Sequence, residues 1–97
     1  MSKGYWVVSI TVTDEAPYRQ YVAANATIFD KWGGRFIVRG GTFETKLGAA
    51  GARQVVIEFE SYDAAVGCYN SEDYQGALKL LLAGATVAQL VIVEGVP

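Results

Sequence analysis

The chain has 97 residues, eight Lys plus Arg against ten Asp plus Glu, and a formal net charge of −2 at pH 7. This length suits one domain with a single core, and the small, outnumbered basic set argues against binding to nucleic acid. The sequence has no histidine and a single cysteine, Cys68, which excludes an internal disulfide, histidine-activated nucleophiles and imidazole metal sites.

Any chemistry must therefore use Tyr, Arg, Lys, Asp, Glu or a borrowed cofactor. We predict no metal site and no resident cofactor.

The first predicted element is a strand over residues 5–13, "YWVVSITVT". Its residues alternate with a period of two, so that one face is uniformly apolar. That face carries Trp6, Val8, Ile10 and Val12. Because polar Ser9 and Thr11 interrupt the apolar run, the N-terminal segment resembles neither a signal peptide nor a membrane span. We expect a cytoplasmic protein that does not associate with membranes.

A helix is predicted next, capped by Asp14 and continuing to Trp32. Asn25 falls in the middle of its apolar stripe. Gly33 and Gly34 follow the last periodic residue, which is the usual place for a glycine that ends a helix. They come after a helix and before a strand, the reverse of the context in which a glycine-rich loop cradles a phosphate.

The segment "RFIVR", residues 35–39, is predicted to be the second strand. Strict alternation puts Phe36 and Val38 on one face, and Arg35, Ile37 and Arg39 on the other. Residues 42–52 have the composition of a loop, and "RQVVIEFE", residues 53–60, is the third strand. Ser61 and Ser71 can each cap a helix, and "AQLVIVEG", residues 88–95, is the last strand.

The order of elements is strand, helix, strand, strand, helix, strand in a single domain covering residues 1–97. This order predicts an α+β class protein, a ferredoxin-like βαββαβ sandwich with a four-stranded antiparallel sheet. Both helical regions then cover one face of the sheet, and the opposite face stays apolar enough to need a cover. A second copy of the chain, packed face to face, is the simplest one, so we predict a homodimer.

Several segments in this order resemble the DUF1330 family of the dimeric α+β barrel superfamily: "YVAAN", "WGGRFIVRGG", "VVIEF", "CYNSEDYQ" and "LVIVEG". The resemblance covers essentially the whole chain and implies a ferredoxin-like protomer and a face-to-face dimer. Similar barrels include cofactor-independent monooxygenases, lactone isomerases, haem-degrading enzymes and ligand sensors, so fold alone does not give the reaction. The matching polar positions are Asn25, Arg39, Glu58, Tyr69, Ser71 and Tyr74. Leu81 departs from the pattern, because an arginine is expected near it in many relatives.

Arg39 and Glu58 are the candidate catalytic residues. Arg39 could stabilise an anion, and Glu58 could act as a base if burial raises its pKa; alternatively, the two form a cross-strand ion pair. The candidate ligand-binding residues are Asn25, Tyr69, Ser71, Tyr74, Tyr5 and Ser9. For most of these a purely structural role, as a cap or a packed side chain, stays open.

Two functions from different classes follow. The first is a homodimeric small-molecule-binding protein with a pocket in each protomer, bounded by the uncovered sheet face and the helices. Such a protein could be a cofactor-independent enzyme of the proton-transfer or oxygenase type. The second is a non-catalytic ligand-sensing or structural dimer.

Overall fold

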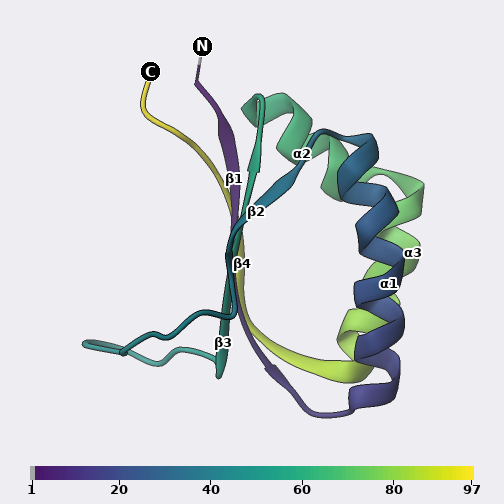
Figure 1. The fold of residues 1–97 in the computed structure, drawn as a ribbon, viewed down its shortest axis with the longest axis vertical. Helices are drawn as coiled ribbons and strands as arrows, with labels where there is room; N and C mark the ends of the chain where they lie inside the picture. The colour runs from purple at the N-terminus through teal and green to yellow at the C-terminus, as the bar shows by residue number, and fades with distance from the viewer. Residues whose placement is uncertain (1) are drawn as a thin grey trace.

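A computed structural model describes residues 2–97 (Figure 1). The elements in chain order are β1 (Gly4–Val12), α1 (Glu15–Lys31), β2 (Arg35–Arg39), β3 (Arg53–Phe59), α2 (Tyr62–Asn70), α3 (Glu72–Gly84) and β4 (Ala85–Glu94). The second helical region is therefore two consecutive helices. The predicted ferredoxin-like order is confirmed, and β4 begins three residues earlier than its alternation indicated.

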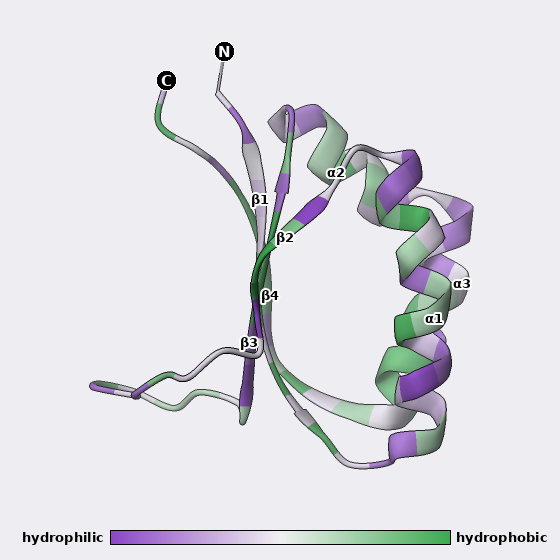
Figure 2. Ribbon diagram, in the orientation of Figure 1, coloured by the Kyte–Doolittle hydropathy of each residue, from purple (hydrophilic) through white to green (hydrophobic). Residues whose placement is uncertain are grey.

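The strands form one antiparallel sheet in the order β2-β3-β1-β4. All three helices pack on one face of this sheet, and no helix within residues 2–97 covers the other face (Figure 1). We call the first the helix face and the second the open face. Figure 2 shows apolar residues along the central strands, as expected for a sheet with one face in a core.

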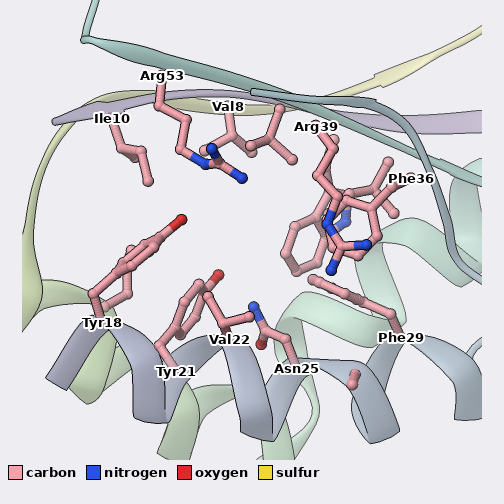
Figure 3. A pocket seen from close by; sticks show the side chains of 15 residues that line it. Val8, Ile10, Tyr18, Tyr21, Val22, Asn25, Phe29, Phe36, Arg39 and Arg53 are labelled. Carbon is pink, nitrogen blue, oxygen red and sulfur yellow. The ribbon is translucent and has the colours of Figure 1, made fainter. Parts of the chain in front are cut away.

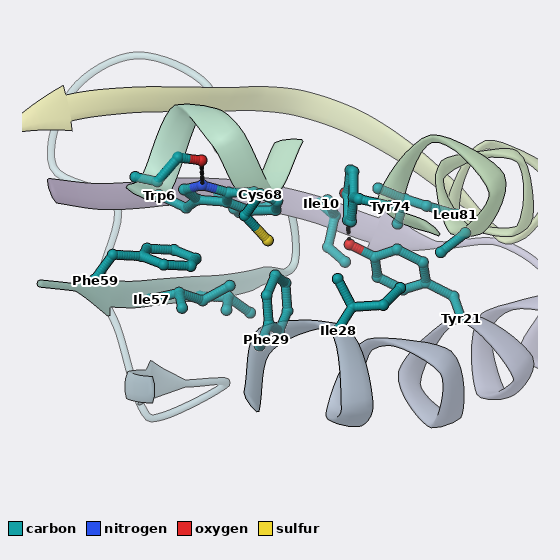
Figure 4. Close-up of a cluster of buried hydrophobic side chains, with 14 of the residues drawn as sticks. Trp6, Ile10, Tyr21, Ile28, Phe29, Ile57, Phe59, Cys68, Tyr74 and Leu81 are labelled. Atoms are coloured by element: carbon teal, nitrogen blue, oxygen red, sulfur yellow. Dashed lines mark hydrogen bonds between the residues drawn. The ribbon is translucent and has the colours of Figure 1, made fainter. Parts of the chain in front are cut away.

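The core lies between the helix face and the helices, and it is rich in aromatic rings. Trp6 is fully buried, with ring centroids of Tyr74 and Phe29 at 4.8 and 5.1 Å. Its indole nitrogen donates to the carbonyl oxygen of Ala65 in α2 at 2.9 Å (Figure 4). This bond fixes α2 against β1 and satisfies a polar group that would otherwise be costly to bury.

The predicted caps are confirmed at all three helices. Asp14 accepts a hydrogen bond from the backbone of Ala16 at the start of α1. Ser61 and Ser71 accept from the third residue after each of them, at 3.0 and 3.2 Å. Gly33 has a φ of +73°, which ends α1 in the left-handed conformation that glycine adopts at low cost.

A β-bulge in β2 changes which face its last residues occupy. Phe36 pairs with Ile57, but Val38 pairs with Val56 and Arg39 with Val55, so that Ile37 is an extra residue. After the bulge, Val38 shares a face with Val56, and Arg39 shares the helix face with Val55. The prediction that Arg39 and Ile37 lie together on the uncovered face is therefore wrong for Arg39, because strict alternation does not anticipate an inserted residue.

Residues 40–52 link β2 to β3 without a helix or strand and project from the open-face side of the sheet (Figure 1). We call this segment the arm. Its apolar side chains Phe43 and Leu47 are 42% and 94% exposed. The arm returns to the sheet at Gly51, whose backbone amide donates to Ser9 Oγ at 2.7 Å.

Candidate functional site

A pocket lies between α1 and the helix face of the sheet (Figure 3). The space between its walls is about 590 Å³, including the part continuous with solvent, and the centre of a water molecule can occupy about 60 Å³ of it. Its walls are formed by Trp6, Val8, Ile10, Tyr18, Tyr21, Val22, Asn25, Ala26, Phe29, Phe36, Arg39, Arg53, Val55, Ile57 and Leu81. Mostly apolar walls with a few polar groups are typical of small-molecule sites. The pocket uses the covered face of the sheet, which corrects the expectation that the uncovered face bounds it.

Two arginines reach this pocket from the sheet, Arg39 from the end of β2 and Arg53 from the start of β3 (Figure 3). The guanidinium of Arg39 lies over the ring of Phe36, 4.2 Å from its centroid. Arg53 packs against Gly40, where any side chain would collide with the guanidinium. Gly40 also has a φ of +68°, a backbone conformation that favours glycine.

The polar residues that α1 contributes are Asn25 and Tyr21. Asn25 is buried, and its Oδ1 has no hydrogen-bond partner within residues 2–97. The hydroxyl of Tyr21 is 2.8 Å from that of Tyr74, which belongs to α3 and is fully buried. Burial raises the pKa of both tyrosines, and the neighbouring Tyr21 raises that of Tyr74 further. Both hydroxyls are therefore protonated at neutral pH.

Glu58, the predicted base, lies on the open face and not in this pocket. Its carboxylate accepts hydrogen bonds from Tyr5 at 3.1 Å and from Arg35 Nε at 3.0 Å. Partial desolvation and the Glu58 carboxylate raise the pKa of the Tyr5 hydroxyl. The predicted Arg39–Glu58 ion pair is wrong, because the bulge turns Arg39 to the opposite face and Arg35 pairs with Glu58 instead.

The remaining predicted residues have structural positions. Ser9 lies on the open face under the returning end of the arm. Ser71 caps α3 and also donates to the carbonyl oxygen of Cys68 at 2.7 Å. The ring of Tyr69 packs against the rings of Trp6 and Tyr74, with centroid distances of 5.8 and 5.4 Å. Among the predicted site residues, only Asn25 and Arg39 line the pocket.

The structure adds Arg53, Tyr18 and Tyr21 to the candidate site. A signal for Arg53 is present in the sequence, since it is in phase with Val55 and Ile57 on the apolar side of the third strand. A charged residue is unusual on the core-facing side of a strand. Arg53 therefore indicates that polar groups have access to this end of the core. Leu81 also lines the pocket, at the position where an arginine was expected in relatives.

Burial of Cys68 gives a prediction for alkaline pH. Desolvation raises the pKa of its thiol from an ordinary 9.0 to about 12. The native state therefore holds this proton more tightly than the unfolded chain, and the resulting stabilisation is complete below pH 9 and lost as the pH rises toward 12. We expect the urea midpoint to fall between pH 8 and about pH 10.5. Cys68→Ala should have a shallower decline, and equal slopes in the two proteins would contradict the assignment.

The family model for the domain of unknown function DUF1330 matches residues 3–96. The chain belongs to the DUF1330 family. No functionally curated protein matches its sequence. Among residues 2–97 of this DUF1330 protein, no helix is both long and apolar enough to cross a bilayer.

Solved structures share the fold at low sequence identity. A protein of unknown function from Rhodopseudomonas palustris superposes with a TM-score of 0.78 and 15% identity, covering 99% of this chain and 84% of that one. SnoaB, a cofactor-independent oxygenase from Streptomyces nogalater, gives 0.64 and 16%, covering 100% and 96%. A dimeric ferredoxin-like protein of unknown function from Thermobifida fusca gives 0.57 and 12%, covering 99% and 92%. These likenesses show that the DUF1330 chain has a ferredoxin-like fold, and fold alone does not carry a reaction.

Proposed function

We propose that this DUF1330 protein is a homodimeric small-molecule-binding protein with one pocket in each protomer. The observation that carries the proposal is the pocket between α1 and the sheet, whose aromatic walls enclose a polar group left without a partner in the protein. Arg53 Nε is buried there without a hydrogen bond within residues 2–97. Since an unpaired buried polar group is costly, a bound molecule or ordered water is expected to accept this hydrogen bond.

The open face supports the dimer. It carries Val38, Val91 and Val93, which are 40%, 44% and 45% exposed. Val91 pairs with Val7 of β1, Val7 with Val56 of β3, and Val56 with Val38 of β2, so that a row of valines crosses the open face. A second copy packed against this surface would remove its apolar side chains from water, which favours face-to-face pairing.

The arm extends this surface. The arm runs out on the open-face side of the sheet (Figure 1), and its residues Phe43 and Leu47 are both exposed in the isolated chain. In a face-to-face dimer, an arm on this side would lie along the partner and bury those side chains. The Thermobifida fusca protein with this fold is dimeric, which is consistent with a dimer here.

Catalysis is the second candidate, and the structural likeness to the oxygenase SnoaB favours it. In this case Arg39 would stabilise an anion, with the tyrosine hydroxyls as proton donors. Glu58 cannot act on the same bound molecule within a protomer, because it lies on the opposite face of the sheet. The raised pKa values of Tyr21 and Tyr74 make them poor bases at neutral pH. We therefore favour ligand binding without turnover over catalysis.

Native mass spectrometry of freshly purified protein tests this proposal. The expected species is a dimer that carries a discrete extra mass, which is lost on unfolding. A monomer at micromolar concentration would contradict the assembly. A dimer without extra mass, which also fails to bind the two small probes described below, would contradict the role of the pocket.

A further inference from the structure

The charges around the pocket are strongly one-sided. Arg39 and Arg53 both line it, and none of its lining residues within the described chain is acidic. The chain as a whole carries a net charge of −2. Two arginines in one pocket give it a positive potential although the protein as a whole is acidic. Such a local positive potential attracts anions.

The two other arginines of the sequence make the contrast clear. Arg35 pairs with Glu58 at 2.8 Å, and Arg19 pairs with Glu15 at 4.0 Å. Arg39 and Arg53 form no ion pair within residues 2–97, although they are the arginines that reach the interior space. Arg53 Nε is buried and has no hydrogen-bond acceptor among residues 2–97. A bound molecule at this end of the pocket could supply one.

The rest of the pocket indicates what the acceptor is attached to. Val8, Ile10 and Val55 form one wall, and Phe29 and Phe36 form another with their rings 5.6 Å apart. These walls suit an apolar, ring-sized body and would not replace the water around a strongly hydrated inorganic anion. The planar forks of two guanidinium groups match a carboxylate, to which they can donate in pairs.

We propose that the pocket binds a small organic acid, with the carboxylate between Arg39 and Arg53 and the apolar body against Phe29 and Phe36. This inference rests on the proposed function and names the ligand class of the same site. Asn25, whose amide nitrogen faces the pocket in Figure 3, supplies a further donor from α1. Leu81, which is buried, adds a further apolar side chain to the lining.

The test compares benzoate with benzamide, which share a ring and differ in charge. Both are titrated into the ¹⁵N-labelled dimer while amide and arginine Nε–H signals are followed. We expect benzoate to bind at least about 10-fold more tightly and to shift the Nε–H signals of Arg39 and Arg53. Arg39→Gln and Arg53→Gln should each weaken benzoate binding by about 10-fold and leave benzamide unchanged, because each removes a charge-assisted bond.

Arg19→Gln, an exposed arginine on α1 outside the pocket, is the matched control and should leave both affinities unchanged. If Arg53→Gln does not fold, Arg53→Lys keeps the charge without the fork and should still weaken benzoate. Equal affinities for the two probes, or inorganic phosphate binding as tightly as benzoate, would overturn the organic-acid inference while the pocket still binds small molecules. Binding of neither probe at millimolar concentration would overturn the organic-acid inference, and it would overturn the proposed function as well if the purified protein also carries no extra mass.

Discussion

Val91→Lys is expected to convert the protein to monomers. Val91 lies on β4, an edge strand of the sheet, opposite Val7 of β1, and is 44% exposed in the isolated chain. A two-fold interface would contain the substitution twice, and each new ammonium group would have to be buried without a carboxylate partner. We expect the dimer dissociation constant to rise by at least about 100-fold, which corresponds to roughly 3 kcal/mol. Sedimentation velocity over a range of protein concentrations measures this change.

Leu82→Lys is the matched control, because Leu82 is an apolar residue of α3 that is 60% exposed and lies away from the open face. This variant should remain dimeric. The Val91→Lys protein should keep its circular dichroism spectrum and, since Val91 does not line the pocket, its affinity for benzoate. A Val91→Lys protein that still sediments as a dimer would show that the subunits meet through another surface.

Trp6→Ala should be the most destabilising single substitution in the core. The indole is fully buried, lies within 5.7 Å of the Phe59 ring, and donates a hydrogen bond to Ala65. Removing such a side chain costs the transfer free energy and leaves a cavity, about 3–5 kcal/mol in total. Because small domains are stable by only about 5–15 kcal/mol, a large share of the folding free energy would be lost. Urea unfolding at one fixed protein concentration gives the value, since the proposed dimerisation would add to the apparent stability.

Trp6→Phe separates the contributions to this loss. It keeps an aromatic ring against Phe29 and Tyr74 and removes the bond to Ala65 together with part of the volume. A loss of about 1–2 kcal/mol is expected. If Trp6→Phe were as destabilising as Trp6→Ala, the hydrogen bond to α2, and not ring packing, would dominate at this position.

The fold could be predicted because its signals are local. Trp6, Val8 and Ile10 alternate regularly with the residues of the open face, and the capping side chains Ser61 and Ser71 stand directly before their helices. In the last strand, alternation alone allows either Leu90, Ile92 and Glu94 or Val91 and Val93 on the open face. Pairing with β1 decides between them, because it places Val91 and Val93 there. A bulge between Val87 and Gln89 separates this part of β4 from its first residues. The predicted strand did not include those first residues.

The site was predicted only in part, because it depends on long-range geometry. Asn25 was found from its place on an apolar helical stripe, and Arg53 could have been found from its phase in the third strand. Arg39 was predicted to stabilise an anion, but it was placed on the wrong side of the sheet. Glu58 was assigned to it as a partner on the assumption of an unbroken strand, whereas the real partner is Arg35, which precedes the bulge.

The extra residue at Ile37 has a consequence for how this family can diverge. A regular strand of the same length would pair Val38 with Val55 and Arg39 with Gln54, so that both residues would exchange sides of the sheet. Arg39 would then lie on the open face, and the pocket would lose one of its two arginines. Ligand preference could thus be gained or lost through the local geometry of one strand, with every pocket-lining side chain still encoded.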